Sequence, residues 1–453
     1  MNIEKNSEES TALIKNFVRQ TNMEYTLNDV ERRFLGFEFS TDSLSLTDNQ
    51  DIEHQLRFYE KSYGLSLVNS IAIKLVAKAQ VKERVVINLF ELSELEEFFL
   101  NRLEKIKPDN WNFEYKNIQH RILPVSHTYK AMRLYQNVGD TWTARVISDF
   151  LLESDSLISK DSKLLRDISF NYFGLDDPLA TKAIVLEAVK LKAETAEENN
   201  ILVSGMYILS LLYSRHLPKP FRNFDKSASY LDKAYEIISN EKIPVKNRLF
   251  EKVFNRNGYA FILFFEKKYD ETVNLMLSLI NEIKPVVKEN PFAKLHLAVL
   301  TYNLFQVYNL SGNTEKAQAT IMELFLLDPN DVEYKYDYIR FLFENGRAGE
   351  TKNILDDLQK NNIGDPVFQN SYYAQHFMAL EQFEEALPFA YRAVIYNYDK
   401  TQSNRFLYNY IIAAFNVGYK VDTSFILNNL EDKEEFYEEV KSLADQYVGN
   451  EIQ

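Results

Sequence analysis

The chain has 453 residues, of which 45% are hydrophobic and 26% charged, and its formal net charge is −14. An acidic protein repels phosphate backbones, so this charge argues against nucleic acid as a partner. The chain has no cysteine, which excludes disulfides, thiolate catalysis and cysteine-ligated zinc. It has only 12 glycines and 11 prolines, and so few helix breakers favour helices joined by short turns.

The start of the chain and its apolar runs bear on targeting. Residues 1–11 are polar and lack the apolar segment of a secretory signal. The longest continuous apolar run lies near 259–265 and is too short to cross a bilayer. These features predict a soluble cytoplasmic protein without membrane insertion.

Residues 1–120 are expected to form a separate, mostly helical domain. Helical periodicity marks 51–79 and 92–106. Apolar and polar residues alternate over 37–46, which predicts a small β-hairpin there. The run 85–90, Val-Val-Ile-Asn-Leu-Phe, fits a strand or a buried helix segment equally well, because its periodicity does not separate the two.

From about residue 121 a short phrase recurs along the chain. Gly312-Asn-Thr-Glu-Lys-Ala317 resembles Gly139-Asp-Thr-Trp-Thr-Ala144 and Glu381-Gln-Phe-Glu-Glu-Ala386. Each reads as a turn, a helix start and a small residue where two helices approach closely. Small or hydroxyl residues repeat at intervals of 34 to 45 residues, at Ala144, Ala183, Ser227, Thr272, Ala317, Thr351, Ala386 and Thr423. This period predicts an all-α, right-handed helical-repeat solenoid of about eight helical hairpins over residues 121–430.

The clearest unit runs from about 298 to 330. Its first helix is expected over 297–310 and ends at Gly312, since glycine after a helix relieves left-handed strain. The second helix begins at Thr314 and places Ala317, Ile321 and Leu324 on one face. Pro329 ends it, because proline cannot continue a helix.

These motifs resemble the tetratricopeptide-repeat superfamily over about residues 125–430. One unit matches that pattern at Tyr308, Gly312, Ala317 and Pro329. Another matches it at Phe377, Phe383, Ala386, Ala390 and Ala393. The resemblance implies helix-turn-helix units stacked in a superhelix, a role in binding proteins or peptides, and no particular partner.

The last segment, 431–453, is expected to form a capping helix. Phe436, Val440 and Leu443 share one apolar stripe, while the neighbouring glutamates face water. Terminal repeats need such a polar outer face.

The sequence offers no catalytic or metal-binding constellation. None of the six histidines has a second ligand at helical spacing. The glycines form no phosphate-cradling loop, and the acidic clusters read as solvated helix faces. We therefore expect no cofactor and no metal, and a protein that is not an enzyme.

The concave groove of the repeats is the predicted binding site. In such a fold the first helices of successive units line this groove, and equivalent positions stack into ladders. We count the units from about residues 253, 298, 332, 367 and 404. Carboxamides pair with both groups of a peptide backbone, tyrosines add rigid contact area, and an arginine can meet a carboxylate through two hydrogen bonds. The predicted peptide- or protein-binding residues are Asn257, Phe261, Tyr302, Asn303, Gln306, Tyr336, Arg340, Tyr372, Gln375, Tyr408 and Asn409.

The leading hypothesis is a non-enzymatic scaffold or adaptor that binds a protein or an extended peptide in this groove. One alternative is a peptide-sensing bacterial regulator that acts on a partner protein. Another is an enzyme, or an enzyme subunit, with its site in the N-terminal domain. A homodimer interface on the tyrosine-rich helices also stays open as an alternative.

Overall fold

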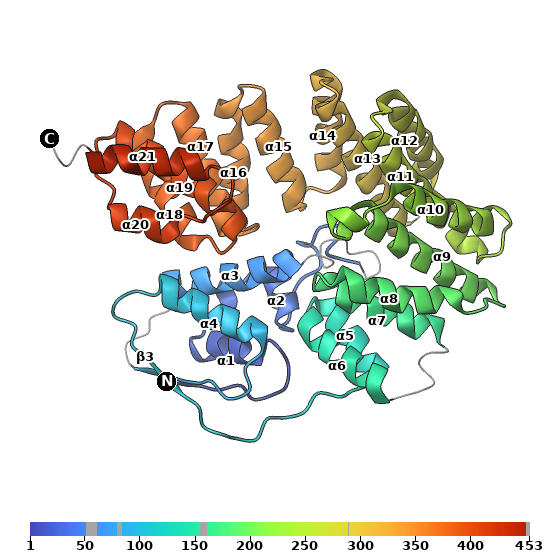
Figure 1. Ribbon diagram of the computed structural model, residues 1–453, viewed down its shortest axis with the longest axis horizontal. Helices are drawn as coiled ribbons and strands as arrows, with labels where there is room; N and C mark the ends of the chain where they lie inside the picture. The colour runs from blue at the N-terminus through green and yellow to red at the C-terminus, as the bar shows by residue number, and fades with distance from the viewer. Residues whose placement is uncertain (51–60, 79–83, 155–160, 289, 450–453) are drawn as a thin grey trace. The chain divides into compact units, whose positions relative to one another are not determined.

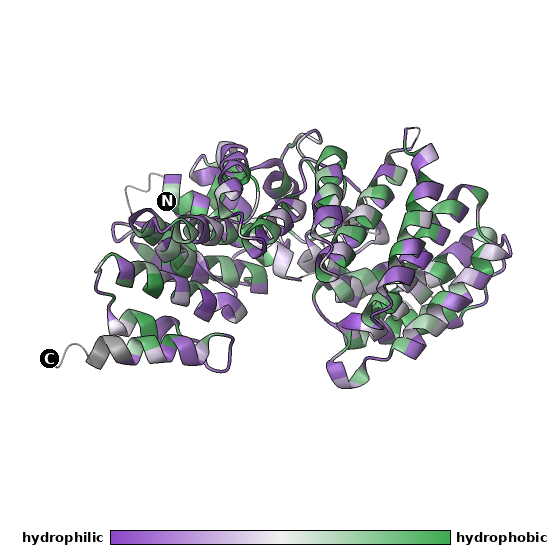
Figure 2. Cartoon of the chain, turned by 90° about the horizontal axis from the view of Figure 1, so that it is seen from above, coloured by the Kyte–Doolittle hydropathy of each residue, from purple (hydrophilic) through white to green (hydrophobic). Residues whose placement is uncertain are grey.

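The computed structural model describes residues 1–50, 61–78, 84–154, 161–288 and 290–449 (Figure 1). Over these residues the chain is all-α apart from three short strands, which confirms the predicted fold class. Green and purple alternate around the helices in Figure 2, as expected where one face of each helix is buried. The helices are α1 (Ala12–Gln20), α2 (Asp29–Phe34), α3 (Lys61–Lys78), α4 (Glu94–Ile106), α5 (Tyr129–Val138), α6 (Thr141–Ser154), α7 (Ser162–Gly174), α8 (Pro178–Lys190), α9 (Ala196–Leu211), α10 (Phe224–Ser239), α11 (Val245–Phe265), α12 (Tyr269–Ile283), α13 (Pro291–Leu310), α14 (Thr314–Leu327), α15 (Val332–Glu344), α16 (Thr351–Lys360), α17 (Pro366–Ala379), α18 (Phe383–Tyr396), α19 (Lys400–Asn416), α20 (Thr423–Asn429) and α21 (Tyr437–Gly449).

The chain divides into two compact units that do not follow chain order. Unit 1 comprises residues 1–32, 65–122 and 335–453, and unit 2 comprises residues 33–64 and 123–334. Each unit therefore joins part of the N-terminal segment to a run of repeats. Boundaries at 120 and 430 were expected from the sequence, and independent folding of residues 1–120 stays a prediction.

Unit 1 contains a parallel three-stranded sheet in the order β1-β2-β3, formed by β1 (Asn2–Ile3), β2 (Val85–Asn88) and β3 (Phe113–Lys116). Ile3 pairs with Ile87, which in turn pairs with Tyr115. Phe17 of α1 and Phe99 of α4 are fully buried, and their ring centroids lie 5.7 Å apart in an edge-to-face contact. Phe17 also contacts Phe113 of β3, with 6.3 Å between ring centroids. Of the two expectations for 85–90, the strand is therefore confirmed.

The hairpin expected over 37–46 is wrong, because those residues contain no strand. Their apolar and polar side chains alternate within a loop.

The N-terminal helices of unit 1 pack against its repeats. Arg102 of α4 donates from Nε to Asn69 Oδ1 of α3 at 2.8 Å and from a terminal nitrogen to the Tyr396 carbonyl at 3.0 Å. Asn69 Nδ2 also donates to the Tyr396 carbonyl, at 3.0 Å. That carbonyl lies at the end of α18, where helical carbonyls lack partners within the helix. Side chains from α3 and α4 thus complete the end of a repeat helix.

Unit 2 contains the helices α5–α14, in which each helix contacts the next along the chain. The described residues form eight helical hairpins, from α5–α6 to α19–α20. Six of the eight small anchor residues are completely buried at the start of the second helix of their hairpin, namely Ala144, Ser227, Thr272, Ala317, Thr351 and Ala386. At the α7–α8 hairpin the anchor was placed two residues late, since Ala183 is exposed and Thr181 is buried.

The hairpin turns explain why the repeat motif is hard to recognise in the sequence. Seven hairpins close through a residue with positive φ between their two helices. Four of these residues are glycines, at 139, 312, 346 and 418, but three are Asp176, Lys267 and Glu381, with φ of 61°, 60° and 58°. A non-glycine residue pays about 1 kcal/mol for this conformation. The same turn is therefore made without its usual glycine signal.

The remaining hairpin, α9–α10, has a different connection. A π-helical segment, Leu212–His216, continues α9, and a short 3₁₀ helix, Lys219–Phe221, precedes α10. The carbonyl of Leu212 accepts from the backbone N–H of Leu217 at 2.9 Å, which closes the widened turn. Such π segments widen a helix locally and re-aim its side chains.

Candidate peptide-binding pocket

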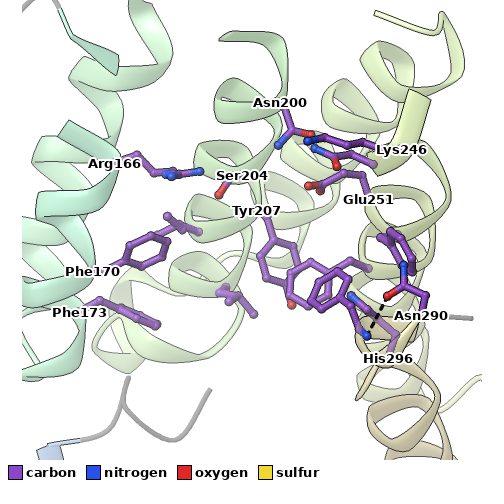
Figure 3. Close-up of a pocket in the computed structure, with 16 residues that line it drawn as sticks. Arg166, Phe170, Phe173, Asn200, Ser204, Tyr207, Lys246, Glu251, Asn290 and His296 are labelled. Carbon is purple, nitrogen blue, oxygen red and sulfur yellow. Dashed lines mark hydrogen bonds between the residues drawn. The ribbon is translucent and has the colours of Figure 1, made fainter. Parts of the chain in front are cut away.

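A cavity of about 390 Å³ opens in unit 2 between α7, α9, α11 and α13, the first helices of four successive hairpins (Figure 3). This volume falls within the range of pockets that hold small ligands or a few residues of a peptide. The four helices reach the cavity with side chains at helical spacing, one turn apart. On α9 these are Asn200, Ser204, Tyr207 and Leu211.

Helix caps set the starting points of these lining helices. Thr195 and Glu198 form a reciprocal capping box at the start of α9, with the Thr195 hydroxyl accepting from the Glu198 backbone. Asn290 caps α13 by accepting from the N–H of Phe292 at 2.9 Å. The capped ends leave Asn200 and Phe292 within the first turns of their helices, at the cavity wall.

One end of the cavity is aromatic. Tyr207 and Phe254 are 4.1 Å apart between ring centroids, and Phe250 and Phe292 are 5.0 Å apart. The His296 ring is 4.5 Å from that of Phe292, at an interplanar angle of 88°. These rings come from α9, α11 and α13 and together form an apolar surface suited to a large side chain.

The other end is polar and carries both signs of charge. Figure 3 shows Asn200, Glu251 and Lys246 at this end, with Arg166 of α7 opposite them and Ser204 of α9 pointing toward Arg166. Lys246 is exposed at the rim, whereas Arg166 is 4% exposed.

Arg166 belongs to a buried network behind the cavity wall. Its terminal nitrogen lies 2.6 Å from the carboxylate of Asp167, which also accepts from the Tyr129 hydroxyl at 2.6 Å. Arg133 lies 3.9 Å from the same carboxylate. The network anchors the guanidinium and offsets its charge, as a buried ion requires.

Asn200 contributes a buried acceptor to the wall of the cavity. Its Oδ1 is buried and, among the described residues, accepts no hydrogen bond. A buried acceptor without a donor costs roughly 1–3 kcal/mol, so this atom points to a donor supplied by a ligand. The Tyr207 hydroxyl is a further donor, since burial raises its pKa to about 12 and keeps it protonated at neutral pH.

The predicted ladder residues of unit 2 lie beyond the cavity, toward the C-terminal ends of α11 and α13. Asn303 Nδ2 donates to Asn257 Oδ1 at 2.9 Å, so these two carboxamides pair with each other. Phe261 packs against Phe265 at 4.5 Å. Tyr302 packs against Tyr334 at 5.0 Å, and Gln306 is exposed.

The predicted ladder residues of unit 1 are mostly engaged with their neighbours. Tyr336 and Tyr372 are 4% and 5% exposed, and the Tyr336 hydroxyl donates to the Asp365 carbonyl at 3.2 Å. Arg340 is exposed, pairs with Asp337 and donates to the Tyr372 hydroxyl at 3.3 Å. The other three ladder residues of unit 1, Gln375, Tyr408 and Asn409, are half-buried. Gln375 donates to the Ser371 hydroxyl, and Tyr408 packs against Phe436. Peptide binding by the ladder residues of both units stays a prediction.

Sequence reasoning missed the cavity because the first helices begin earlier than expected. The units were counted from about 253 and 298, whereas α11 begins at Val245 and α13 at Pro291. The cavity residues Phe250 and Phe292 lie in these extra turns. Phe254 and His296, four residues later on each helix, repeat the same spacing and were the available signal.

The described residues contain no group of three or more acidic or histidine side chains arranged to hold a metal ion. None of their helices combines the length and hydrophobicity needed to cross a bilayer.

Comparison with known proteins gives only distant structural likenesses. No family model matches the chain, and no curated protein matches it in sequence. The apo form of RapI is 13% identical with a TM-score of 0.38, covering 62% of this chain and 92% of its own. The TPR domain of P58(IPK) is 11% identical with a TM-score of 0.22, covering 71% of this chain and 97% of its own. Both scores are below 0.5, so the fold class rests on the helices of the chain itself.

Proposed function

We propose that this chain is a non-enzymatic binding protein whose unit 2 cavity receives a segment of a peptide or partner protein. The buried, unpartnered Oδ1 of Asn200 beside an aromatic surface is the observation that carries the proposal. A peptide supplies both groups that this cavity can bind. Its N–H groups can donate to the Asn200 carboxamide, and its side chains can fill the aromatic end. The acidic charge of the chain favours a protein or peptide over nucleic acid.

The polar groups of the cavity suit binding better than catalysis. A hydrolytic serine needs a base within hydrogen-bond reach. Figure 3 places Ser204 beside Arg166 and places His296 among the aromatic rings at the other end. The two side chains are therefore not a nucleophile and base pair, and Ser204 serves as a hydrogen-bonding group in the wall.

The test is peptide binding by the purified full chain against a library of short peptides. Ser204→Phe fills the cavity without removing a core contact and is expected to lower affinity at least tenfold. The matched control, Ser278→Phe, adds the same group at an exposed position on α12 and should leave affinity unchanged. Peptides recovered after binding should have their original mass. Equal binding by both variants would contradict the proposed site, and cleaved peptide would contradict a non-enzymatic role.

A further inference from the structure

We infer that the unit 2 cavity recognises the free amino terminus of a peptide whose first residue is aromatic or large and apolar. This inference rests on the proposed function and specifies the ligand of the same site. It places the terminal ammonium between Asn200 and Glu251 and the first side chain against the aromatic end of the cavity.

The polar end offers two acceptors from two packed helices. Asn200 Oδ1 on α9 is buried and accepts no hydrogen bond among the described residues. Glu251 on α11 presents its carboxylate at the same end of the cavity (Figure 3). A carboxylate accepts several hydrogen bonds at once, so Glu251 can take a ligand donor in addition to its contacts within the chain.

An ammonium satisfies this pair better than an internal peptide N–H does. An internal N–H carries one hydrogen and no charge, so it reaches only one of the two acceptors. A terminal ammonium carries three hydrogens and a positive charge. It can donate to Asn200 and Glu251 together, and charge-assisted hydrogen bonds are the stronger kind.

The positive groups of the cavity are placed to receive the rest of the peptide. Arg166 faces the acceptor pair from α7 and shares its charge with Asp167, at 2.6 Å. Lys246 is exposed at the rim. Both are donors only, so they suit the carbonyl groups that follow the first residue.

The aromatic end determines the first side chain. This surface is lined by two ring pairs, Tyr207 with Phe254 at 4.1 Å and Phe250 with Phe292 at 5.0 Å. A polar side chain placed against these rings would lose its hydrogen bonds to water. An aromatic or large apolar side chain buries against them, and aromatic pairs add to the gain from burial alone. A peptide that starts with alanine lacks this contact.

The experiment compares three series of C-terminally amidated tetrapeptides by calorimetry with the full chain. The first series begins with Phe, Tyr, Trp or Leu and has a free amino terminus. The second is the same set with N-acetyl groups, and the third begins with Ala. The expected result is at least a tenfold loss of affinity on acetylation and a similar loss with Ala. Phenylalaninamide separates a peptide from a small aromatic amine, since it should bind at least tenfold more weakly than the best tetrapeptide.

Variants connect this result to the residues. Glu251→Gln and Asn200→Ala should remove most of the difference between free and acetylated peptides. Glu236→Gln, an exposed glutamate of α10, is the matched control and should retain that difference. Affinity for free peptides should also fall as pH rises past about 8, where a terminal ammonium loses its proton. The cavity is also lined by titratable groups of the protein, namely Arg166, Lys246, Glu251, His296 and Tyr207. Acetylated peptides have no terminal ammonium, so any change of their affinity with pH measures the contribution of these protein groups.

The outcomes separate the inference from the function on which it rests. Equal binding of acetylated and free peptides would overturn recognition of the amino terminus while leaving peptide binding in place. Phenylalaninamide binding as tightly as the tetrapeptides would overturn the assignment to a peptide. Binding by none of the tetrapeptides and none of the wider library would overturn both proposals.

Discussion

The Asn257 carboxamide on α11 accepts a hydrogen bond from the Asn303 carboxamide on α13, with 2.9 Å between Oδ1 and Nδ2. The two residues hold equivalent places on the first helices of successive hairpins. Asn257 is 9% exposed, so most of the hydrogen bond is shielded from water. The carboxamide ladder predicted for ligand contact thus also connects neighbouring repeats.

Asn303→Ala is expected to lower the free energy of unfolding by about 1 kcal/mol, because Asn257 loses a donor in a largely buried position. Urea unfolding of Asn257→Ala, Asn303→Ala and the double variant should give a coupling energy of about 0.5–1.5 kcal/mol. Asn274→Ala, at an exposed site on α12, is the control and should change stability by less than about 0.5 kcal/mol. Additive effects of the two substitutions would show that the hydrogen bond does not stabilise the repeats.

Gly64 of α3 is required for close packing against Trp142 of α6. A Cβ at Gly64 would lie 2.6 Å from the indole ring, and glycine here has an ordinary helical conformation. Alanine normally stabilises a helix interior by about 1 kcal/mol relative to glycine. We expect Gly64→Ala instead to destabilise the chain by about 1–3 kcal/mol, as overpacking does, with a corresponding fall in the thermal midpoint.

A smaller ring at Trp142 should reduce this loss of stability. In a Trp142→Phe background, Gly64→Ala should cost less than in the wild type, because the larger indole is no longer in contact. The comparison needs only the two pairs of thermal midpoints. A penalty of the same size in both backgrounds would assign the cost to something other than the indole.

The repeats were predictable because their signal is local. A buried small residue where two helices cross leaves a trace at a fixed distance from the turn, and Ala317 and Ala386 were found in this way. The turn itself was less reliable, since Asp176 and Lys267 adopt the left-handed conformation without being glycine. The loop 37–46 shows the converse error, in which alternation occurs without strand pairing.

The cavity and the sheet depend on contacts distant in sequence. β1 is two residues long, and its pairing with β2 joins Ile3 to Ile87, so no local pattern marks it. The cavity needs α7, α9, α11 and α13 in register, and an error of seven or eight residues in the helix starts moved the predicted site along α11 and α13. The identity of Asn200 as an unpartnered acceptor requires the packed structure.

Arg102 connects α4 to the end of α18 within unit 1. It is 6% exposed, and burial lowers its pKa to about 10, which leaves it charged at neutral pH. Arg102→Met removes the donors to Asn69 and to the Tyr396 carbonyl and should cost about 2–4 kcal/mol. Amide hydrogen exchange should rise in both α4 and α18.

Arg102→Lys serves as the comparison because it keeps the charge but lacks the planar fork of donors. It should fall between the wild type and Arg102→Met in stability. Faster exchange confined to α4 in Arg102→Met would mean that the contact with the repeat does not depend on this arginine.

His216 should make the stability of unit 2 sensitive to acid. Burial lowers its pKa to about 4, with smaller contributions from the nearby positive charges of Arg215 and Arg222. Its ring lies against the edge of Phe173 at 4.6 Å. The unfolded chain, in which a histidine has a pKa of about 6.5, binds the proton more readily than the folded chain does. The contribution of neutral His216 is therefore complete above about pH 6.5 and is lost as pH falls toward 4.

Partial exposure reduces this effect, and we expect about 1–2 kcal/mol between pH 7 and pH 4. Thermal midpoints of the wild type and His216→Asn should be measured between pH 7 and pH 4. Comparing the two proteins separates the contribution of His216 from that of the carboxylates, which also titrate in this interval. The variant should lose less stability than the wild type as pH falls, whatever its stability at pH 7. Phe173 lines the cavity and contacts His216, so protonation of the histidine should also weaken peptide binding before unit 2 unfolds. Parallel pH curves for the two proteins would show that His216 is not the acid-sensitive group.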